Sequence, residues 1–368
     1  MARPTALRSA THRLQLPLLI GAVLLFTSSI GTSPQAPEPL KVILDTDLGF
    51  ASDDAMALLI LLQSDKVDLL GVTVVTGNDW LDQEVANTLR LLEIAGRPDV
   101  PVYAGSERPL INSREEMVRR EALFGETSDG SYRGAWREGG PGPREVRPPD
   151  GRFATHRPEP DSAANFIIAT VRRFPGEVVL AAIGPLTNVA LALAKDPEIA
   201  SLAREIVIMG GGIESRPEFN FWMDPEAAGM VLRAPWRSLT LTPLDICEQA
   251  PFTRGVATAA AEGDSPIARY FTGTFLERAE HPVSPLMYDQ IAVLSLLEPS
   301  VITRVEEMWL DVEIDHGASY GAMLFWDQER KPPAHVRAGR VQIDLDYARF
   351  VEAFLELMRR PVRSPDAR

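Results

Sequence analysis

An apolar run, a cluster of carboxylates and a helical repeat follow one another between Val42 and Leu62. The run Val42–Leu44 is typical of a buried parallel strand, and the later apolar residues recur at the spacing of an α-helix. Ligands of open α/β sheets bind outside the carboxyl ends of the strands. The stretch therefore predicts an α/β fold with an acidic ligand site after its first strand. The carboxylates of this site are Asp45, Asp47, Asp53 and Asp54.

A metal ion is the expected partner of these four carboxylates. Asp53 and Asp54 fall at the start of the helix, where capping and the helix dipole favour anions. That position offsets only part of the repulsion among the four charges. A hard divalent cation offsets more, and Ca²⁺ binds about six to eight oxygen ligands, often from Asp. The alternative is a helix cap with solvated acidic residues, but four aspartates at one strand end favour the metal.

Charge and cysteine content exclude several classes of protein. The chain has 368 residues and a formal net charge of −14, which argues against nucleic acid and anionic membranes as partners. Its single cysteine, Cys247, excludes an intramolecular disulfide. The balance of apolar and charged residues is that of an ordinary globular protein.

The N-terminal 31 residues have the layout of a secretory signal peptide. Three arginines precede the apolar core Leu14–Phe26, and small polar residues follow it. An uncleaved membrane anchor is the alternative, but this core is shorter than the roughly 20 residues that span a bilayer. We therefore expect cleavage after residue 31, a Pro-rich linker at 32–39, export to the periplasm or medium, and no stable membrane insertion afterwards.

Strands and helices alternate along the rest of the chain. This alternation predicts one open, mostly parallel twisted sheet flanked by helices over residues 40–360, with 361–368 as a tail. Apolar β-rich runs cover 67–77, 100–105, 177–184, 204–212, 238–245, 308–314 and 340–345, and helical patterns cover 81–95, 161–174 and 346–359.

Residues 111–160 interrupt the alternation. The stretch is rich in Gly, Pro, Arg and Glu and has no persistent hydrophobic period, so it predicts a long irregular insertion. Its aromatic residues Tyr132 and Trp136 are candidates to stack on a ligand or to cover the site. A mobile surface loop is the equally weighted alternative.

The sequence DTDLGFASDDAMAL at residues 45–58 resembles the signature of the inosine-uridine-preferring nucleoside hydrolase family. The usual form there is DTDPGxDDAxAL, and this chain is similar to a longer form, DTDxGxxxDDAxAL. It has two extra residues between Gly49 and Asp53 and departs at Ala51, where another Asp is frequent. Matching segments continue along about residues 40–360, weakest across the insertion, and imply the Rossmann-like fold of that family. They are GN at 77–78, IGPLTNVALAL at 183–193, IVIMGG at 206–211, EFN at 218–220 and MYDQ at 287–290.

The resemblance implies a set of residue roles. One Ca²⁺ would be held by Asp47, Asp54, Asp289 and the backbone carbonyl of Ile183, and Asp47 would also be the general base toward the attacking water. Asp45 would support these ligands by hydrogen bonding. The substrate would be bound by Asp53, Asn78, Met209, Glu218 and Asn220.

Tyr288 is the main departure from the family's pattern. Purine-type members often have His there, which is the easier leaving-group acid near neutral pH. A Tyr can still donate a proton or a hydrogen bond. The resemblance therefore leaves two candidates for the leaving-group acid, Tyr288 and a residue of the insertion.

The implied activity is calcium-dependent hydrolysis of the N-glycosidic bond of ribonucleosides, which gives free base and ribose and serves nucleoside salvage. The partner is a small-molecule nucleoside, and the family is commonly homo-oligomeric. An exported calcium-dependent nucleoside or sugar binding protein without turnover is the alternative, because the His is missing and the loop between Gly212 and Glu218 is short. Aspartate-nucleophile phosphatases also have a DxD after a strand, but they leave EFN and MYDQ unexplained. The base preference is open.

Overall fold

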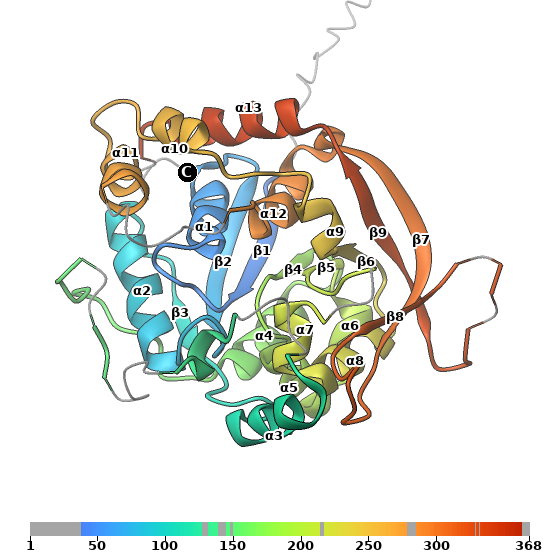
Figure 1. Ribbon diagram of the computed structural model, residues 1–368. Helices are drawn as coiled ribbons and strands as arrows, with labels where there is room; N and C mark the ends of the chain where they lie inside the picture. The colour runs from blue at the N-terminus through green and yellow to red at the C-terminus, as the bar shows by residue number, and fades with distance from the viewer. Residues whose placement is uncertain are drawn as a thin grey trace, which may run out of the picture. The chain divides into compact units, whose positions relative to one another are not determined.

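One mixed sheet of nine strands runs through the computed structural model, which describes residues 38–126, 132–138, 145–147, 150–213, 217–277, 285–327, 329–330 and 332–362. The expected signal peptide and most of the linker and tail lie outside these residues. The strand order is β3-β2-β1-β4-β5-β6-β9-β7-β8 (Figure 1). The strands are β1 (Leu40–Thr46), β2 (Val67–Val74), β3 (Val102–Ala104), β4 (Val178–Ala182), β5 (Glu205–Met209), β6 (Leu239–Thr242), β7 (Ile302–Val312), β8 (Met323–Trp326) and β9 (Arg337–Leu345).

The first six strands have the doubly wound arrangement that the alternating pattern predicts. Every pair among them is parallel, and the order β3-β2-β1-β4-β5-β6 reverses direction between β1 and β4. The other edge is antiparallel, because β7 pairs antiparallel with both β8 and β9. The fold is thus a mostly parallel, open sheet, and its topological switch point lies between β1 and β4.

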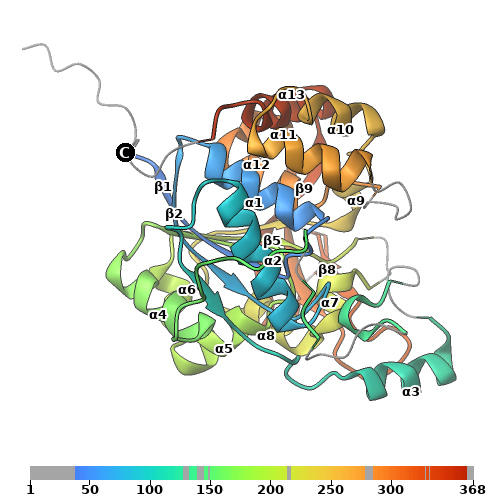
Figure 2. The same cartoon turned by 90° about the vertical axis from the view of Figure 1, so that its left-hand side faces the viewer.

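Helices cover both faces of the sheet (Figures 1 and 2). Alternate residues of β1 face opposite ways: Val42 and Leu44 belong to one apolar core and Ile43 to the other. The first core contains α1 (Asp53–Gln63), α2 (Leu81–Ile94), α10 (Arg254–Ala260), α11 (Pro266–Phe271), α12 (Asp289–Leu297) and α13 (Tyr347–Met358). The second contains α4 (Ala163–Arg173), α5 (Thr187–Lys195), α6 (Ile199–Leu202) and α8 (Pro225–Arg233).

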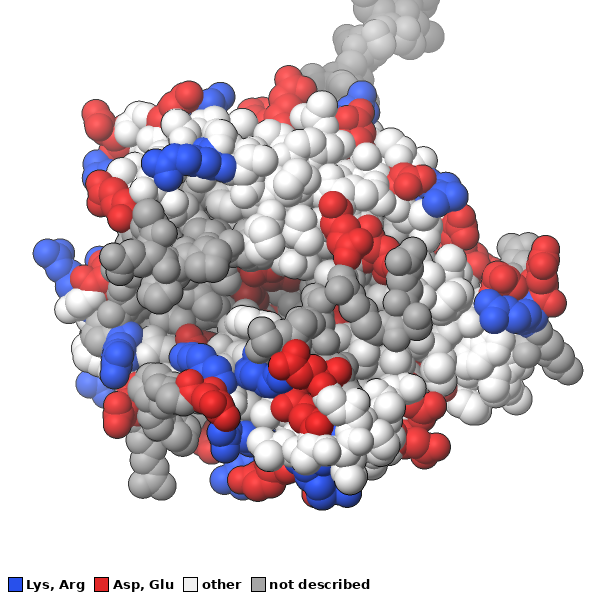
Figure 3. Space-filling view, viewed as in Figure 1, with Lys and Arg blue, Asp and Glu red and all other residues white. Residues whose placement is uncertain are grey.

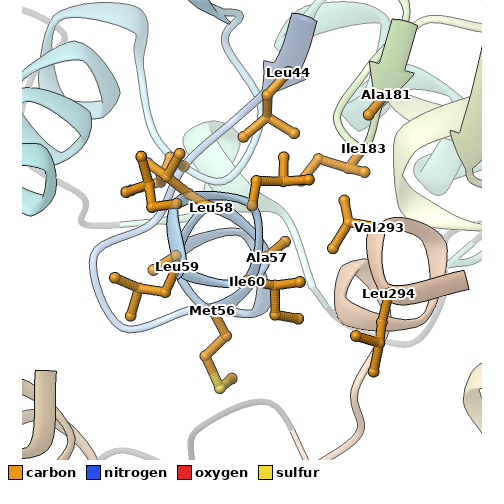
Figure 4. Packing of buried hydrophobic residues seen from close by; sticks show 14 of the residues in the cluster. Leu44, Met56, Ala57, Leu58, Leu59, Ile60, Ala181, Ile183, Val293 and Leu294 are labelled. Atoms are coloured by element: carbon orange, nitrogen blue, oxygen red, sulfur yellow. The ribbon is translucent and has the colours of Figure 1, made fainter. Parts of the chain in front are cut away.

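Helix α1 is a central helix rather than an amphipathic surface helix. Every residue from Asp54 to Gln63 is buried, because α1 packs against β2, α12 and α13, with α12 alongside it (Figure 4). Ser52 caps its first turn by accepting a hydrogen bond from the Ala55 amide. The acidic residues at its start are therefore fixed in place by a fully packed element.

The prediction of an irregular insertion at 111–160 is wrong in part. Helix α3 (Arg114–Phe124) and a 3₁₀ turn (Gly134–Trp136) lie within it. The sequence of α3 has no repeating apolar stripe, because only Met117 and Arg120 of its side chains are buried. Ser113 caps the helix and Glu116 follows three residues later, a start signal that the sequence contains.

The remaining helices are short. They are α7 (Phe219–Met223) and α9 (Leu244–Cys247), with a π-helical turn at Thr272–Leu276 and a 3₁₀ turn at Pro299–Val301. Asp224 caps α8, and Pro225 lies in the first turn of the helix. Within the described parts of the chain, no helix is both long and apolar enough to span a bilayer.

Candidate functional site

A cavity of about 560 Å³ opens at the switch point of the sheet. Figure 3 shows acidic side chains at the bottom of a hollow on the face drawn in Figure 1. Strands β1 and β4 end there side by side, and the Ile183 amide donates to the Asp45 carbonyl at 2.8 Å. All ten residues predicted to bind metal or substrate or to act in catalysis line the cavity: Asp47, Asp53, Asp54, Asn78, Ile183, Met209, Glu218, Asn220, Tyr288 and Asp289.

The Asp47 carboxylate fills space that is free only because residues 77 and 184 are glycines. A Cβ added to Gly77 would lie 2.0 Å from Asp47 Oδ2, and one added to Gly184 would lie 2.6 Å from Asp47 Oδ1. The backbone N–H of Asn78 donates to Asp47 Oδ2 at 2.8 Å. The Asp47 side chain is 1% exposed, so its carboxylate is held from both sides at the floor of the cavity.

Asp54 is held by three side chains. Thr46 Oγ1 donates to its Oδ1 at 2.6 Å, and Ser52 Oγ and Asn78 Nδ2 donate to its Oδ2 at 3.2 Å and 2.9 Å. These neighbours come from the end of β1, the cap of α1 and the turn after β2. Hydrogen bonds of this kind fix the orientation of a metal-ligating carboxylate.

Three carboxylates converge in the cavity. Asp53, Asp54 and Asp289 each offer an oxygen atom, and these oxygens all lie within 4.8 Å of one another. Asp54 and Asp289 are predicted metal ligands, whereas Asp53 is predicted to bind the sugar and here lies in the same cluster. Asp47 is not part of this group of three, although it lines the same cavity.

Burial and mutual repulsion disfavour the charged forms of these carboxylates. Burial and the neighbouring Asp54 raise the pKa of Asp53 to about 7. Burial raises the pKa of Asp47 and of Asp289 well above the ordinary range, and the charges of nearby aspartates add to it. Hard oxygen donors that repel one another in a buried cavity fit a divalent cation, which relieves this repulsion.

Asp45 lies beneath the cavity rather than in it. Thr73 Oγ1 and Asn188 Nδ2 donate to its Oδ1 at 2.6 Å and 2.8 Å. Its Oδ2 has no hydrogen-bond partner among the residues that the structure describes, and burial raises its pKa to about 7. Asp45 therefore ties the end of β1 to β2 and α5 through Thr73 and Asn188, neither of which is a predicted metal ligand.

The opposite wall is built around α7. Glu218 caps this helix, and its carboxylate accepts hydrogen bonds from the amides of Gly211 and Asn220, each at 2.8 Å. Asn220 Nδ2 donates to the carbonyl of Ile183 at 2.8 Å and to that of Met209 at 3.2 Å. A carbonyl oxygen accepts two hydrogen bonds or ligands, so the Ile183 oxygen keeps one position for a cation.

The start of α12 also lines the cavity. Asp289 is its first residue and is 2% exposed, and Tyr288 precedes it at the helix N-cap. Both residues line the same cavity as the carboxylate cluster.

Tyr132 of the insertion, a candidate from the sequence to stack on a ligand or to cover the site, lines the cavity, and its hydroxyl donates to Asn78 Oδ1 at 2.5 Å. No spacing in that Gly-rich stretch places it beside Asn78. The lining residues that were not predicted from the sequence are Ala51, Ser52, Phe219, Leu244 and Pro285.

Comparison with known proteins gives consistent matches. The family model described as inosine-uridine preferring nucleoside hydrolase matches residues 42–352. The inosine-uridine preferring nucleoside hydrolase of Crithidia fasciculata is 30% identical over 335 residues, which are 88% of this chain and 98% of that protein. A pyrimidine-specific ribonucleoside hydrolase of Escherichia coli is 31% identical over 326 residues, 84% of this chain and 95% of that one. The solved structure of an inosine-guanosine nucleoside hydrolase has a TM-score of 0.70 at 26% identity and covers 86% of this chain and 98% of its own.

Proposed function

This chain belongs to the inosine-uridine preferring nucleoside hydrolase family, and we propose that it hydrolyses the N-glycosidic bond of ribonucleosides with the help of Ca²⁺. The observation that carries this proposal is the convergence of ten residues, matched from distant segments of the sequence, on one cavity at the switch point of the sheet. The products are the free base and ribose.

Four groups of the chain would hold the cation. They are the carboxylates of Asp47, Asp54 and Asp289 and the backbone carbonyl of Ile183, all of which line the cavity. Bound Ca²⁺ would supply the positive charge that orients a water molecule for attack and lowers the pKa of that water. The hydrogen bonds from Thr46 and Asn78 keep Asp54 in position for this task.

The chain's own side chains then account for the reaction. Asp47 takes the proton of the attacking water as general base. Asp53, Asn78, Glu218 and Asn220 bind the sugar hydroxyls at the cavity walls. Glycoside cleavage proceeds through an oxocarbenium-like transition state, whose positive charge the surrounding carboxylates stabilise.

Tyr288 is the proposed proton donor to the leaving base. Tyr288 lines the cavity next to Asp289, and a phenol is protonated at neutral pH. A base that leaves as its anion is a poor leaving group, so a donor at this point lowers the barrier.

A panel of nucleosides tests the proposed function against a binding protein without turnover. The chain without residues 1–31 is incubated with Ca²⁺ and with inosine, guanosine, adenosine, uridine or cytidine, and the free base is quantified. We expect release from at least one nucleoside, and the ranking gives the base preference. Protection against thermal unfolding by nucleosides without any release would instead establish the binding protein.

The N-terminal segment supports a proposal of export. Its three arginines, apolar core and small polar residues are those of a cleaved signal peptide. Expression of the full chain in a bacterial host, followed by cell fractionation and N-terminal sequencing, tests this proposal. Export predicts an extracytoplasmic protein that begins near residue 32, and an intact N-terminus in the cytoplasm would contradict it.

Stabilisation by Ca²⁺ is expected to be larger at pH 8 than at pH 5. Asp53, with its pKa raised to about 7, binds protons more tightly in the folded than in the unfolded chain, and so do Asp47 and Asp289. Raised carboxyl pKa values stabilise the fold below about pH 4, and this contribution is lost as the pH rises through the folded-state values. Ca²⁺ binds the deprotonated carboxylates and offsets the loss. The measurement is Tm of metal-stripped protein with and without added Ca²⁺, and an equal shift at both pH values would contradict the account.

A further inference from the structure

The segment Tyr132–Arg137 of the insertion is attached to the turn after β2. The Ala135 amide donates to the Gly77 carbonyl at 2.8 Å. Arg137 Nη1 donates to the Asn78 carbonyl at 3.2 Å, and Arg137 Nη2 forms an ion pair with Asp79 at 2.5 Å. This end of the insertion is therefore bound to the turn that carries Asn78.

The same segment packs on α7 at the opposite wall of the cavity. The ring of Tyr132 lies 4.9 Å from that of Phe219, and the ring of Trp136 lies 5.6 Å from that of Trp222, both edge to face. Edge-to-face contacts of this kind stabilise a pair of rings beyond the area that they bury. The segment thus bridges two walls of the cavity.

Gly134 makes this bridge possible. Its φ angle is +49°, a left-handed conformation that favours glycine. A Cβ at this position would lie 2.2 Å from the Gly77 carbonyl oxygen and 2.6 Å from Cζ of Phe219. The backbone of the segment is therefore seated directly between the turn after β2 and α7.

The Asn78 side chain connects this segment to the carboxylates. Its Nδ2 donates to the Asp47 carbonyl and to Asp54 Oδ2, both at 2.9 Å, while its Oδ1 accepts the Tyr132 hydroxyl. A flip of the amide would place Oδ1 against the Asp54 carboxylate, oxygen against oxygen. The Tyr132 hydroxyl is the donor of this bond, because the Asn78 Oδ1 atom can only accept.

We propose that Tyr132 is a positioning residue of this site: its hydroxyl, held in place by the segment Tyr132–Arg137, fixes the amide of Asn78 in the orientation that supports Asp47 and Asp54. This inference rests on the proposed function, because it takes the two aspartates as metal ligands. It gives the insertion a specific task, which is to complete the hydrogen-bond network behind the metal ligands.

The Tyr132→Phe variant tests the hydroxyl alone. Loss of a residue that hydrogen-bonds to a metal ligand lowers metal affinity or activity by about 10- to 100-fold. We expect a loss of about tenfold in both Ca²⁺ affinity and kcat, at the low end of that range, because Tyr132 acts through Asn78. Ca²⁺ affinity is measured by titration calorimetry with the metal alone, and kcat and KM are measured with a turned-over nucleoside. Tyr347→Phe is the matched control, since it removes a hydroxyl of α13 that donates to the Pro251 carbonyl.

The Gly134→Ala variant tests the close packing of the segment Tyr132–Arg137 against Gly77 and Phe219. Its added methyl would displace Tyr132, so we expect the same weakening of Ca²⁺ binding and a higher KM, because one wall of the cavity moves. Gly151→Ala is the control, as Gly151 has a φ angle of +82° in the same insertion with no atom within 4 Å of an added Cβ. It should retain the Ca²⁺ affinity of the unaltered protein.

The outcomes separate this inference from the proposed function. Unaltered Ca²⁺ affinity and kcat in Tyr132→Phe, with an active parent protein, would overturn the positioning role and leave the hydrolase standing. A parent protein that binds Ca²⁺ without turnover, and loses affinity in Tyr132→Phe, would support the positioning role and overturn the hydrolase. Equal loss in Tyr132→Phe and Tyr347→Phe would also overturn the positioning role, because a general effect on the fold would explain both.

Discussion

Replacement of Asp47 by asparagine is expected to lower kcat by about 10³-fold, within the range of about 10²–10⁴ that general bases contribute. The change keeps the size of the side chain and leaves an oxygen that can accept the hydrogen bond from the backbone N–H of Asn78. It removes the group that takes the proton of the attacking water and one charge that would hold the cation. Because the Asp47 carboxylate is buried beside other carboxylates, its loss is not expected to destabilise the metal-stripped protein.

The test combines steady-state kinetics with thermal unfolding. Asp344→Asn is the matched control, since Asp344 is a half-buried residue of β9 that pairs with Arg304 outside the cavity. We expect the control to retain kcat and the Asp47→Asn variant to retain Tm without Ca²⁺. A kcat within about threefold of the parent would contradict the role of Asp47, because a general base contributes at least about 10²-fold.

Substitution of Gly77 by alanine is expected to abolish the site by steric exclusion. The new methyl group would lie 2.0 Å from Asp47 Oδ2, so either Asp47 or the turn after β2 must move. Overpacking of this kind costs about 1–3 kcal/mol of stability. Displacement of the general base by about 1 Å lowers the rate by about 10²-fold, and Gly184→Ala is expected to act in the same way from the other side of Asp47.

Activity, Tm and Ca²⁺ affinity are measured together for these glycine variants. Gly255→Ala is the control, because its added Cβ would meet only Thr253 Oγ1, at 3.5 Å, and Gly255 lies within α10. Alanine is favoured over glycine inside a helix by about 0.5–1 kcal/mol, so this variant should be as stable as the parent or more so. Full activity of Gly77→Ala would show that the reaction does not require the position that Asp47 has in the structure.

The sequence predicts the cavity well where its residues follow directly from strand ends. Asp47 after β1, Asn78 after β2 and Ile183 after β4 are adjacent because the carboxyl ends of parallel strands meet at one edge of the sheet. Asp53 and Asp54 follow from the start of α1, a helix that the apolar spacing already indicates. Such positions are set by local pattern and topology together.

Other parts depend on contacts between distant segments that no local pattern encodes. Helix α3 exposes most of its side chains, so it lacks the apolar period by which helices are found. Tyr132 reaches Asn78 only because Gly134 fits between Gly77 and Phe219. The convergence of Asp53 with Asp54 and Asp289 depends on the packing of α1 against α12, and side-chain roles within such a cluster do not follow from spacing.

The most direct measurement of the central claim is the release of ribose by metal-stripped protein as Ca²⁺ is restored. Reducing sugar is assayed with the best nucleoside of the panel, first after chelation and then over a series of Ca²⁺ concentrations. We expect no release above background without the metal, and release that rises to saturation with Ca²⁺, with one ribose formed per free base. Undiminished release from the metal-stripped protein would show that hydrolysis does not depend on Ca²⁺.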